Sequence, residues 1–359
     1  MQKKKILKMI LALLSPFILF GIYVVGVLIY GTFNDWKPEE KISISIDNPH
    51  QIENKIQEED STFSLISWNV GYGGLGANAD FFYDGGKMVR SSKEDVTNYI
   101  KGIQDFLSSY KETDFILLQE VDLHSKRSYY TNEYEKYSTS LQKHTSSIAL
   151  NFKVPFVPIK YFEPIGHVES GVATYSKFNP INATRYQFPG EFGWPTRLFN
   201  LDRCFLVNRF QLTNGKELLV INTHNSAYDK GDMKKAEMEY MSKFLIDEYA
   251  KGNYIIVGGD WNQCPPGFQW DKFAKTPETD YSQISIKEDF MPGGWTWAYD
   301  DKVATNRKLT EKFDIHKTFT TVIDFYLLSP NLQVEEISGV SLDFKYSDHQ
   351  PVMLKCKMK

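Results

Sequence analysis

Six short polar clusters, each placed where an apolar, strand-like run ends, constrain this chain more than any other feature. In chain order they are Trp68-Asn69, Gln119-Glu120, Asn222-Thr223-His224-Asn225, Gly258-Gly259-Asp260-Trp261-Asn262, Asp324 and Tyr346-Ser347-Asp348-His349. Burying carboxylates, amides and imidazoles beside apolar strands is costly unless they pair with one another or bind a cation. The recurrence of these residue types therefore predicts a single site, assembled at the rim of a sheet.

The apolar runs and two periodic segments predict the fold class. Strands are expected over Phe63–Trp68, Phe115–Leu118, Gly171–Tyr175, Cys204–Leu212, Glu217–Thr223, Tyr254–Val257, Val322–Leu328 and Val352–Lys355. Helical apolar stripes are expected over Lys93–Tyr110 and Asp232–Tyr249. Helices lie between strands early in the chain and strand pairs come later, which favours an α/β fold with mixed sheets.

The ordered motifs resemble the endonuclease/exonuclease/phosphatase superfamily, the deoxyribonuclease-I-like phosphoesterases, over roughly Phe63 to Lys355. Gly-Asp-Trp-Asn at 259–262 and Ser-Asp-His at 347–349 are specific when both occur in this order. The stretches Ser170-Gly171-Val172-Ala173 and Thr305-Asn306-Arg307 are also similar to family segments. The resemblance implies a four-layer sandwich of two packed mixed β-sheets flanked by helices.

The resemblance also implies a divalent cation, Mg²⁺ or Mn²⁺, held by Asn69, Glu120 and Asp348. Magnesium prefers oxygen ligands from few carboxylates and keeps several waters. Glu120 is the strongest ligand candidate because it ends an apolar run. For Glu120 taken alone, an ion pair at a strand end is the alternative interpretation.

By the same resemblance, Asp260 orients or deprotonates the attacking water, and Asn262 donates to the phosphoryl oxygens. An Asp-x-Asn turn cap is the alternative for this pair. Asp324 is expected to orient His349, which would contact the scissile phosphate. His224 is expected to protonate the leaving group or to stabilise the charge of the transition state.

Three arginines are weaker candidates for substrate binding: Arg307, Arg203 and Arg197. Arginine suits bidentate contact with phosphate. A solvated or structural ion pair is an equally good interpretation of each.

The N-terminal segment predicts a membrane anchor. Residues 1–8 are basic, and residues 9–30 are apolar and uncharged. As a helix, the apolar segment spans about 33 Å, close to the hydrocarbon thickness of a bilayer. The lysines precede it, so the N-terminus is expected in the cytoplasm and the remainder outside. Bulky residues follow the apolar run instead of a small-x-small cleavage site, which favours an uncleaved anchor over a signal peptide.

The sequence thus divides into a cytoplasmic segment (1–8), a transmembrane helix (9–30), a linker (31–60) and a catalytic domain (61–359). The linker is compatible with a flexible stalk or with an edge strand on the domain.

The net charge and the cysteine content indicate which substrates and bound groups are unfavourable for this chain. The formal net charge is −4 overall, and the part beyond residue 30 carries −8, because the four lysines before it have no acidic counterpart. An acidic body does not favour nucleic acid as substrate, although a local basic cleft remains compatible with one. The three widely spaced cysteines favour neither a disulfide framework nor a zinc site. No protein partner is inferred.

These features together predict a metal-dependent phosphoesterase tethered to the outer face of a membrane. Its substrates are expected among lipid head groups or small phosphodiesters, because the anchored domain carries aromatic loops at 81–83, 188–195 and 290–297. Ordinary loop packing is the alternative for those loops. The competing functions are an extracellular nuclease, which predicts a basic groove, and a non-catalytic binding protein, which predicts losses among the motif residues.

Overall fold

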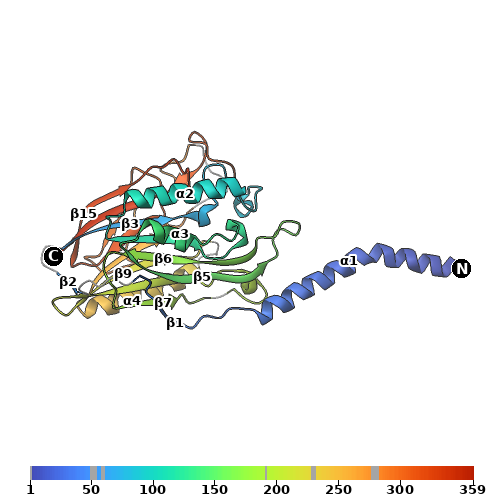
Figure 1. Ribbon diagram of the computed structural model, residues 1–359, viewed down its shortest axis with the longest axis horizontal. Coiled ribbons are helices and arrows are strands. Elements are labelled where there is room, and N and C mark those ends of the chain that lie inside the picture. Colours follow the sequence, from blue (N-terminus) through green and yellow to red (C-terminus); the bar gives the residue numbers. More distant parts are fainter. Residues whose placement is uncertain (1, 49–54, 58–60, 191, 228–231, 276–282) are drawn as a thin grey trace.

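The computed structural model describes residues 2–48, 55–57, 61–190, 192–227, 232–275 and 283–359. Its core consists of two β-sheets packed face to face, with helices on both outer faces and one long helix that leaves the body (Figure 1). The fold class predicted from the sequence is thereby confirmed.

The smaller sheet has six strands in the order β15-β16-β3-β4-β6-β5. Their bounds are β15 Leu332–Gly339, β16 Val352–Met358, β3 Thr62–Asn69, β4 Phe115–Asp122, β6 Gly166–Ser176 and β5 Thr145–Val157. The β3–β4 pair is parallel and its neighbours are antiparallel, so the sheet is mixed.

The larger sheet has eight strands, with the path β1-β7-β8-β9-β10-β14-β11 and β2 pairing with β8. Their bounds are β1 Lys41–Ile44, β7 Asn182–Gln187, β8 Cys204–Leu212, β9 Glu217–His224, β10 Tyr254–Asp260, β14 Asp324–Leu328, β11 Thr296–Ala298 and β2 Lys55–Ile56. A short separate ladder joins β12 (Asn306–Arg307) to β13 (Thr320–Thr321).

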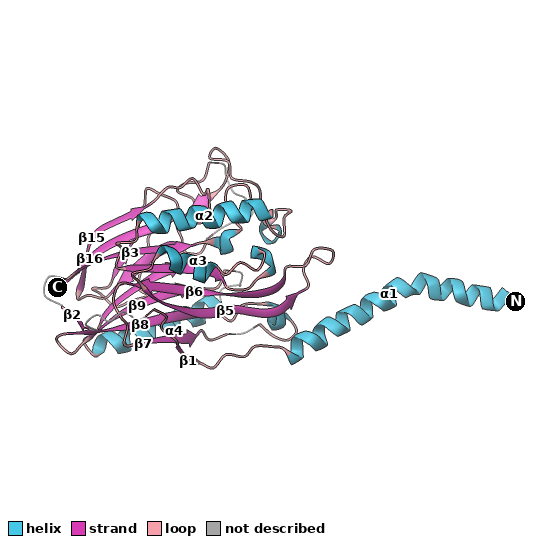
Figure 2. Ribbon diagram, in the orientation of Figure 1, coloured by secondary structure: helices cyan, strands magenta, loops and turns pink. Residues whose placement is uncertain are grey.

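Side-chain alternation along the central strands explains the layers. On β3, Leu65 faces the space between the sheets, whereas Ile66 and Trp68 face outward. Helices α2 (Lys93–Ser109) and α3 (Glu133–Ser140) cover that outer face (Figure 2). Helix α4 (Asp232–Ala250) covers the outer face of the larger sheet. Each large apolar side chain buried in this way stabilises the fold by roughly 1.5–3 kcal/mol before entropic costs.

Helix α1 spans Gln2–Phe33 and projects from the body (Figure 1). It is long and apolar enough to cross a membrane, and none of its most apolar window is buried. These properties make the helix a candidate membrane span. A signal sequence near an N-terminus shares them. Beyond it, Lys41–Ile44 pairs antiparallel with β7, so this part of the 31–60 segment is an edge strand.

Candidate active site

Strand direction brings the polar clusters to one end of the two sheets. The parallel pair β3–β4 places Asn69 beside Gln119, the residue before Glu120. In the other sheet, Asp260 lies between His224 on β9 and Asp324 on β14. Residues separated by up to 280 positions in the sequence therefore meet at the same end of the central strands.

Two amides join the sheets beneath this edge. The Nε2 of Gln119 donates to the Oδ1 of Asn222 across the sheets at 2.8 Å. Asn222 in turn donates to the carbonyls of Leu118 and Ala173. Both side chains are fully buried, and their bonds fix the two sheets against each other at the floor of the site.

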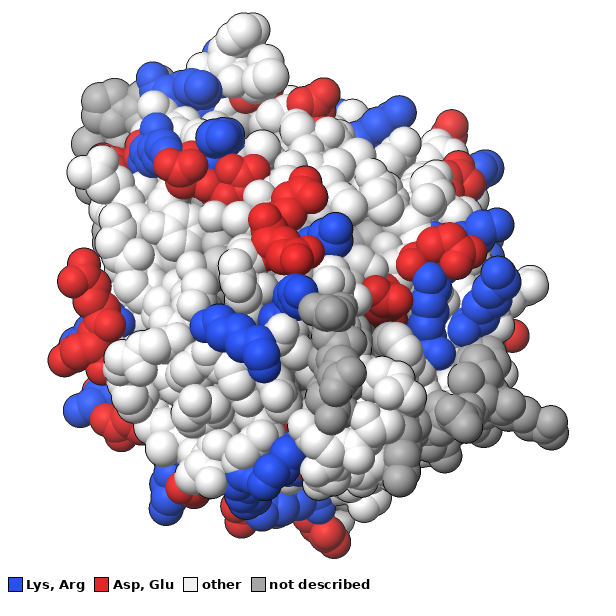
Figure 3. Space-filling view, turned by 90° about the vertical axis from the view of Figure 1, so that its left-hand side faces the viewer, with Lys and Arg blue, Asp and Glu red and all other residues white. Residues whose placement is uncertain are grey.

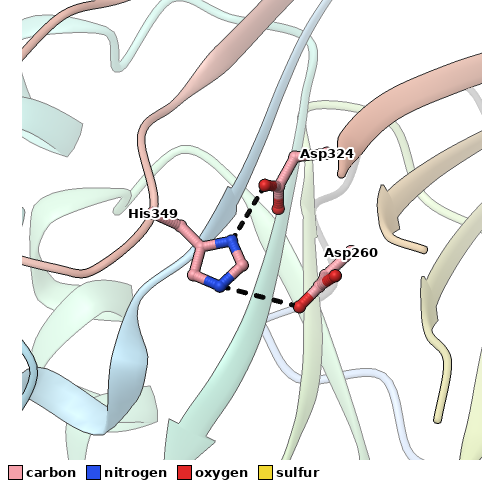
Figure 4. A group of neighbouring side chains, drawn as sticks. All are labelled: Asp260, Asp324 and His349. Atoms are coloured by element: carbon pink, nitrogen blue, oxygen red, sulfur yellow. Dashed lines mark hydrogen bonds and ion pairs between the residues drawn. The ribbon is translucent and has the colours of Figure 1, made fainter. Parts of the chain in front are cut away.

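His349 and Asp324 form the strongest pair in the site. His349 Nδ1 lies 2.8 Å from Asp324 Oδ2, and both residues are buried (Figure 4). The indole of Trp68 donates to the His349 carbonyl, and Thr305 Oγ1 accepts from the Asp324 amide, so both backbones are held. Burial alone would lower the pKa of His349, but the carboxylates of Asp324, Asp260 and Asp348 raise it well above its usual value.

Asp260 stands between the two histidines. Its Oδ2 lies 3.5 Å from His224 Nε2 and 3.8 Å from His349 Nε2, and it accepts a hydrogen bond from Asn69 Nδ2. Burial raises the pKa of Asp260 to about 6, although the His349 charge opposes this. Burial, reinforced by the nearby cationic groups Arg203, His349 and Arg127, lowers the pKa of His224 well below its usual value. The site thus holds one charged and one neutral imidazole near neutral pH.

Asn262 follows Asp260 across a turn and not along an extended strand. Its φ is +49°, and its backbone amide donates to Asp260 Oδ1 at 2.8 Å. The side-chain Nδ2 donates to the Asn225 carbonyl, which uses one of its two N–H groups. The turn cap considered as an alternative is therefore present, and it places Asn262 at the site edge.

Glu120 and Asp348 present oxygen donors to the same space. The strand irregularity after Leu118 and a φ of +56° turn the Glu120 side chain into the site, where it is 24% exposed. Burial, with help from the Glu120 charge, raises the pKa of Asp348 to about 7. Asn69 donates to Glu120 and to Asp260 through Nδ2, while its Oδ1 accepts from the Gly71 amide.

This donor set fits a hard divalent cation. Among the described residues, no lysine or arginine pairs within 4.0 Å with Glu120, Asp260 or Asp348, whose only ionic neighbours are histidines. Glu120, Asp260 and Asp348 together carry more negative charge than the neighbouring His349 balances, and bound Mg²⁺ or Mn²⁺ would relieve the remaining repulsion. Glu120 and Asp348 supply accessible oxygens, and Asn69 orients the carboxylates.

A second set, Asp260, Asp324 and His349, also offers ligand atoms within 4.8 Å of one another. Asp324 Oδ2 is already engaged by His349 Nδ1 at 2.8 Å (Figure 4), and Asp324 Oδ1 is buried without a hydrogen-bond partner among the described residues. We therefore interpret this trio as a hydrogen-bonded charge pair with a neighbouring acid, in keeping with the roles expected from the sequence.

The candidate arginines have different surroundings. Arg307 is 1% exposed, and its Nη2 donates to the carbonyls of residues 75, 76 and 79. This geometry ties a loop together instead of presenting a guanidinium to a substrate. Arg203 is half-buried near His224, and its Nη1 is shielded from solvent without a hydrogen-bond partner in the described part of the chain. Arg197 pairs with Asp35 at 2.6 Å.

Two further residues belong to the site but were not expected from the sequence. Arg127 pairs bidentately with Asp122, its guanidinium lies 3.8 Å above the ring of Tyr72, and its charge reaches Glu120. The only sequence signal for Arg127 was its position a few residues after the Gln119-Glu120 motif. Asn306 Nδ2 lies 3.0 Å from His349 Nε2. The Thr305-Asn306-Arg307 stretch was the signal that could have identified it.

Comparison with known proteins agrees with this geometry. A family model described as "Endonuclease/Exonuclease/phosphatase family" matches residues 66–349. The chain belongs to the endonuclease/exonuclease/phosphatase family. That family is one of phosphoesterases, and the match contains every motif residue discussed above. No curated protein matches the sequence.

Solved structures share the fold at low sequence identity. An endonuclease/exonuclease/phosphatase from Beutenbergia cavernae DSM 12333 has a TM-score of 0.54 and 13% identity, covering 83% of this chain and 72% of that one. One from Bacteroides vulgatus has a TM-score of 0.52 and 14% identity, with 83% and 100% covered. The human Nocturnin catalytic domain with bound sulfate has a TM-score of 0.52 and 13% identity, with 88% and 97% covered.

Proposed function

We propose that this protein is a metal-dependent phosphoesterase that hydrolyses a phosphate ester by attack of an activated water. It is tethered to the outer face of a membrane by residues 9–30, and its substrate is a lipid head group or a small phosphodiester. The observation that carries the proposal is the convergence of eight motif residues at one sheet edge: Asn69, Glu120, His224, Asp260, Asn262, Asp324, Asp348 and His349.

A complete site argues against a non-catalytic binding protein. That interpretation predicts substitutions among the motif residues, because a binding surface has no need for an Asp–His pair beside a cluster of further carboxylates. Here each motif residue is present and the central carboxylates lie within 4 Å of an imidazole. Fold alone would not support an activity; the composition of the site does.

The metal ion, held by Asn69, Glu120 and Asp348, would neutralise charge on the phosphoryl group. Asp260 is placed to position the attacking water, because its carboxylate is buried, is fixed by Asn69, and has a pKa raised to about 6. A base whose pKa lies near the working pH is the most effective one.

The two histidines have different proposed roles, because the pKa of His349 is raised and that of His224 is lowered. His349, protonated and held by Asp324, places a positive charge next to the phosphoryl oxygens. Burial lowers the pKa of His224 well below its usual value, so this imidazole would act mainly by stabilising the charge of the transition state through a hydrogen bond to a leaving or phosphoryl oxygen. The second side-chain N–H of Asn262, for which no partner is found among the described residues, would donate to the phosphoryl group.

Membrane tethering rests on helix α1. Its apolar segment stands outside the packed body, follows a lysine-rich start and is long enough for a bilayer. A catalytic domain held at a membrane meets head groups at a high local concentration, which favours lipid or small diester substrates over long polyanions.

A metal-supplemented activity screen tests the proposal. Full-length protein, reconstituted into nanodiscs, is assayed with Mg²⁺ or Mn²⁺ against DNA, RNA, sphingomyelin, phosphoinositides and a chromogenic diester. The matched controls are Asp260→Asn and His349→Ala. The proposal predicts turnover of a lipid or small diester that both controls and excess chelator abolish. Activity on DNA or RNA alone would point to the nuclease, and no activity on any substrate would overturn catalysis.

A further inference from the structure

The hairpin that joins β5 to β6 carries large apolar side chains into solvent. At its tip, Phe162 is fully exposed (106%), Tyr161 is 64% exposed and Ile159 is 36% exposed. Neighbouring side chains of this size, gathered at a projecting tip, mark an interaction site more often than ordinary surface. These exposed side chains therefore favour contact with an apolar surface or medium.

This tip lies at the end of the molecule that holds the active site. Strands β4 and β6 are antiparallel, with Asp122 opposite Ser170. The start of β6 consequently lies beside the end of β4, where Glu120 is found. Residues 158–165 extend further in the same direction, beyond the active-site edge (Figure 2).

The same end receives helix α1. The ring of Tyr161 meets the ring of Phe20 edge-on at 5.4 Å. Trp194, which is 59% exposed, donates from Nε1 to Thr32 Oγ1 at 3.2 Å. Two separate aromatic loops thus lie against the helix proposed to span the membrane.

The segment after α1 is docked on the domain, so the orientation is defined. Asp35 pairs with Arg197 at 2.6 Å, and the ring of Trp36 lies 5.2 Å from the guanidinium of Arg185. Strand β1 then joins the larger sheet beside β7. A domain held in this way presents one constant end to the bilayer that contains α1.

The opposite end has a different surface. It shows Lys, Arg, Asp and Glu side chains of both signs scattered across its face (Figure 3). Such a surface of mixed charge suits contact with water.

We propose that the hairpin tip 158–165 and Trp194 form a second membrane contact. The rings of the tip reach into the bilayer that α1 spans, with Tyr161 at the level of Phe20 and Trp194 near the outer end of the span at Thr32, and the two contacts hold the active-site end toward lipid in the same membrane. The inference deepens the proposed function and rests on its membrane span. Tyr and Trp favour the membrane–water interface because each combines an apolar ring with a polar O–H or N–H group, and Phe162 adds apolar surface.

Site-specific fluorescence tests the contact in the full-length protein. Phe162→Cys is labelled with an environment-sensitive NBD probe and reconstituted into phosphatidylcholine/phosphatidylglycerol vesicles, with and without nitroxide-labelled lipid. The native Cys204, Cys264 and Cys356 are buried, so labelling is directed to the new thiol. Ile181→Cys is the matched control: it is also an exposed apolar residue, but it lies between β6 and β7 at the other end.

The proposal predicts at least a several-fold stronger nitroxide quenching at position 162 than at position 181. Equal quenching at the two positions would overturn it. Spectral changes at 162 that follow protein density and ignore nitroxide lipid would identify a second copy as the partner, and would overturn it as well.

Two measurements separate this inference from the proposed function. The double variant Tyr161→Ser/Phe162→Ser should hydrolyse the soluble chromogenic diester within about twofold of wild type, since neither residue lies in the site. Wild-type protein without any diester activity would refute the proposed catalysis, whereas the quenching result decides the membrane contact by itself. Extraction of the wild-type protein by alkaline carbonate would refute the membrane span and the contact together.

Discussion

The Nδ1 of His349 lies 2.8 Å from the Oδ2 of Asp324, and these residues are separated by 25 positions and come from different elements. The carboxylate fixes which ring nitrogen carries the proton and stabilises the charged imidazole. Asp324 therefore acts on the substrate only through His349, as a positioning residue.

This relationship predicts non-additive kinetics. His349→Ala should lower kcat by roughly 10²–10⁴-fold, the usual contribution of a well-placed proton-transfer or charge-stabilising group. Asp324→Asn should also lower kcat, because the amide leaves His349 with the wrong hydrogen-bond partner. The double variant should be little worse than His349→Ala alone, since the two residues act as one unit.

Single-turnover kinetics on the substrate found by the screen provide the measurement. Circular dichroism of each variant controls for folding. Losses that multiply independently in the double variant would show that Asp324 and His349 do not work as a pair. Near-normal turnover in His349→Ala would remove this histidine from the catalytic residues.

Glu120 provides the test for the metal. Glu120→Gln should weaken Mn²⁺ binding, measured by isothermal titration calorimetry, and should cut turnover strongly while the fold survives. The physical reason is the loss of the Glu120 carboxylate, which faces the site and is more exposed than that of Asp348. Unchanged Mn²⁺ affinity in this variant, or full wild-type activity in excess chelator, would contradict the proposed metal site.

The sequence predicted the centre of each sheet better than its edges. Strands β3, β4, β8, β9 and β10 are buried along nearly their whole length, and such runs can be recognised without a partner, whereas β16 was recognised although it alternates buried and less buried positions. The two edge strands of the smaller sheet, β5 and β15, were not predicted. β5 is mostly buried but begins with Thr-Ser-Ser and contains Pro155, and β15 buries only Leu332, so neither shows the pattern of a central strand.

The motif residues were predicted because each sits at a strand end in a fixed order. Arg127 and Asn306 were not placed in the site, because their positions come from folding of loops around Tyr72 and His349. The role of the hairpin tip was also beyond the sequence: a Tyr-Phe pair at 161–162 has no meaning until the tip is seen to be exposed beside α1.

An ion-pair network far from the site makes a prediction on stability. Burial would raise the pKa of Glu248, but hydrogen bonds and charges from Arg209 and Lys251 lower it to about 2. A depressed carboxylate pKa stabilises the folded state above the unfolded pKa of about 4.5, and this contribution disappears as the pH falls toward 2.

Glu248→Gln should therefore lower the free energy of unfolding by about 1–3 kcal/mol at pH 6, because Arg209 loses one of its two carboxylate partners and keeps only Glu217. The difference from wild type should shrink as the pH falls below 4.5. Urea unfolding at pH 6, 5 and 4 measures it. A difference that grows on acidification would show the opposite linkage.

Topology can be tested on intact cells. Protease added outside should remove the catalytic body, and the protein isolated from membranes should retain residues 9–30. The lysines before α1 and the absence of a cleavage motif are the reasons. A mature protein that begins after residue 30, or a body that stays protected in intact cells but not in lysed ones, would contradict the anchored arrangement.

Arg203 and Arg307 form a matched pair for separating substrate binding from folding. Arg203 has a shielded Nη1 without a hydrogen-bond partner among the described residues, and its charge acts on His224. Arg203→Ala should raise KM or lower kcat while thermal stability stays near wild type, and Arg203→Lys should restore part of the loss.

Arg307 instead satisfies three loop carbonyls from a buried position. Arg307→Ala should destabilise the fold by about 1–3 kcal/mol, because those carbonyls lose their donor. Differential scanning fluorimetry and steady-state kinetics, run on both variants, distinguish the roles. A destabilised Arg203→Ala with unchanged kinetics in its folded fraction would make Arg203 structural, and an Arg307→Ala of normal stability with a raised KM would return Arg307 to the substrate.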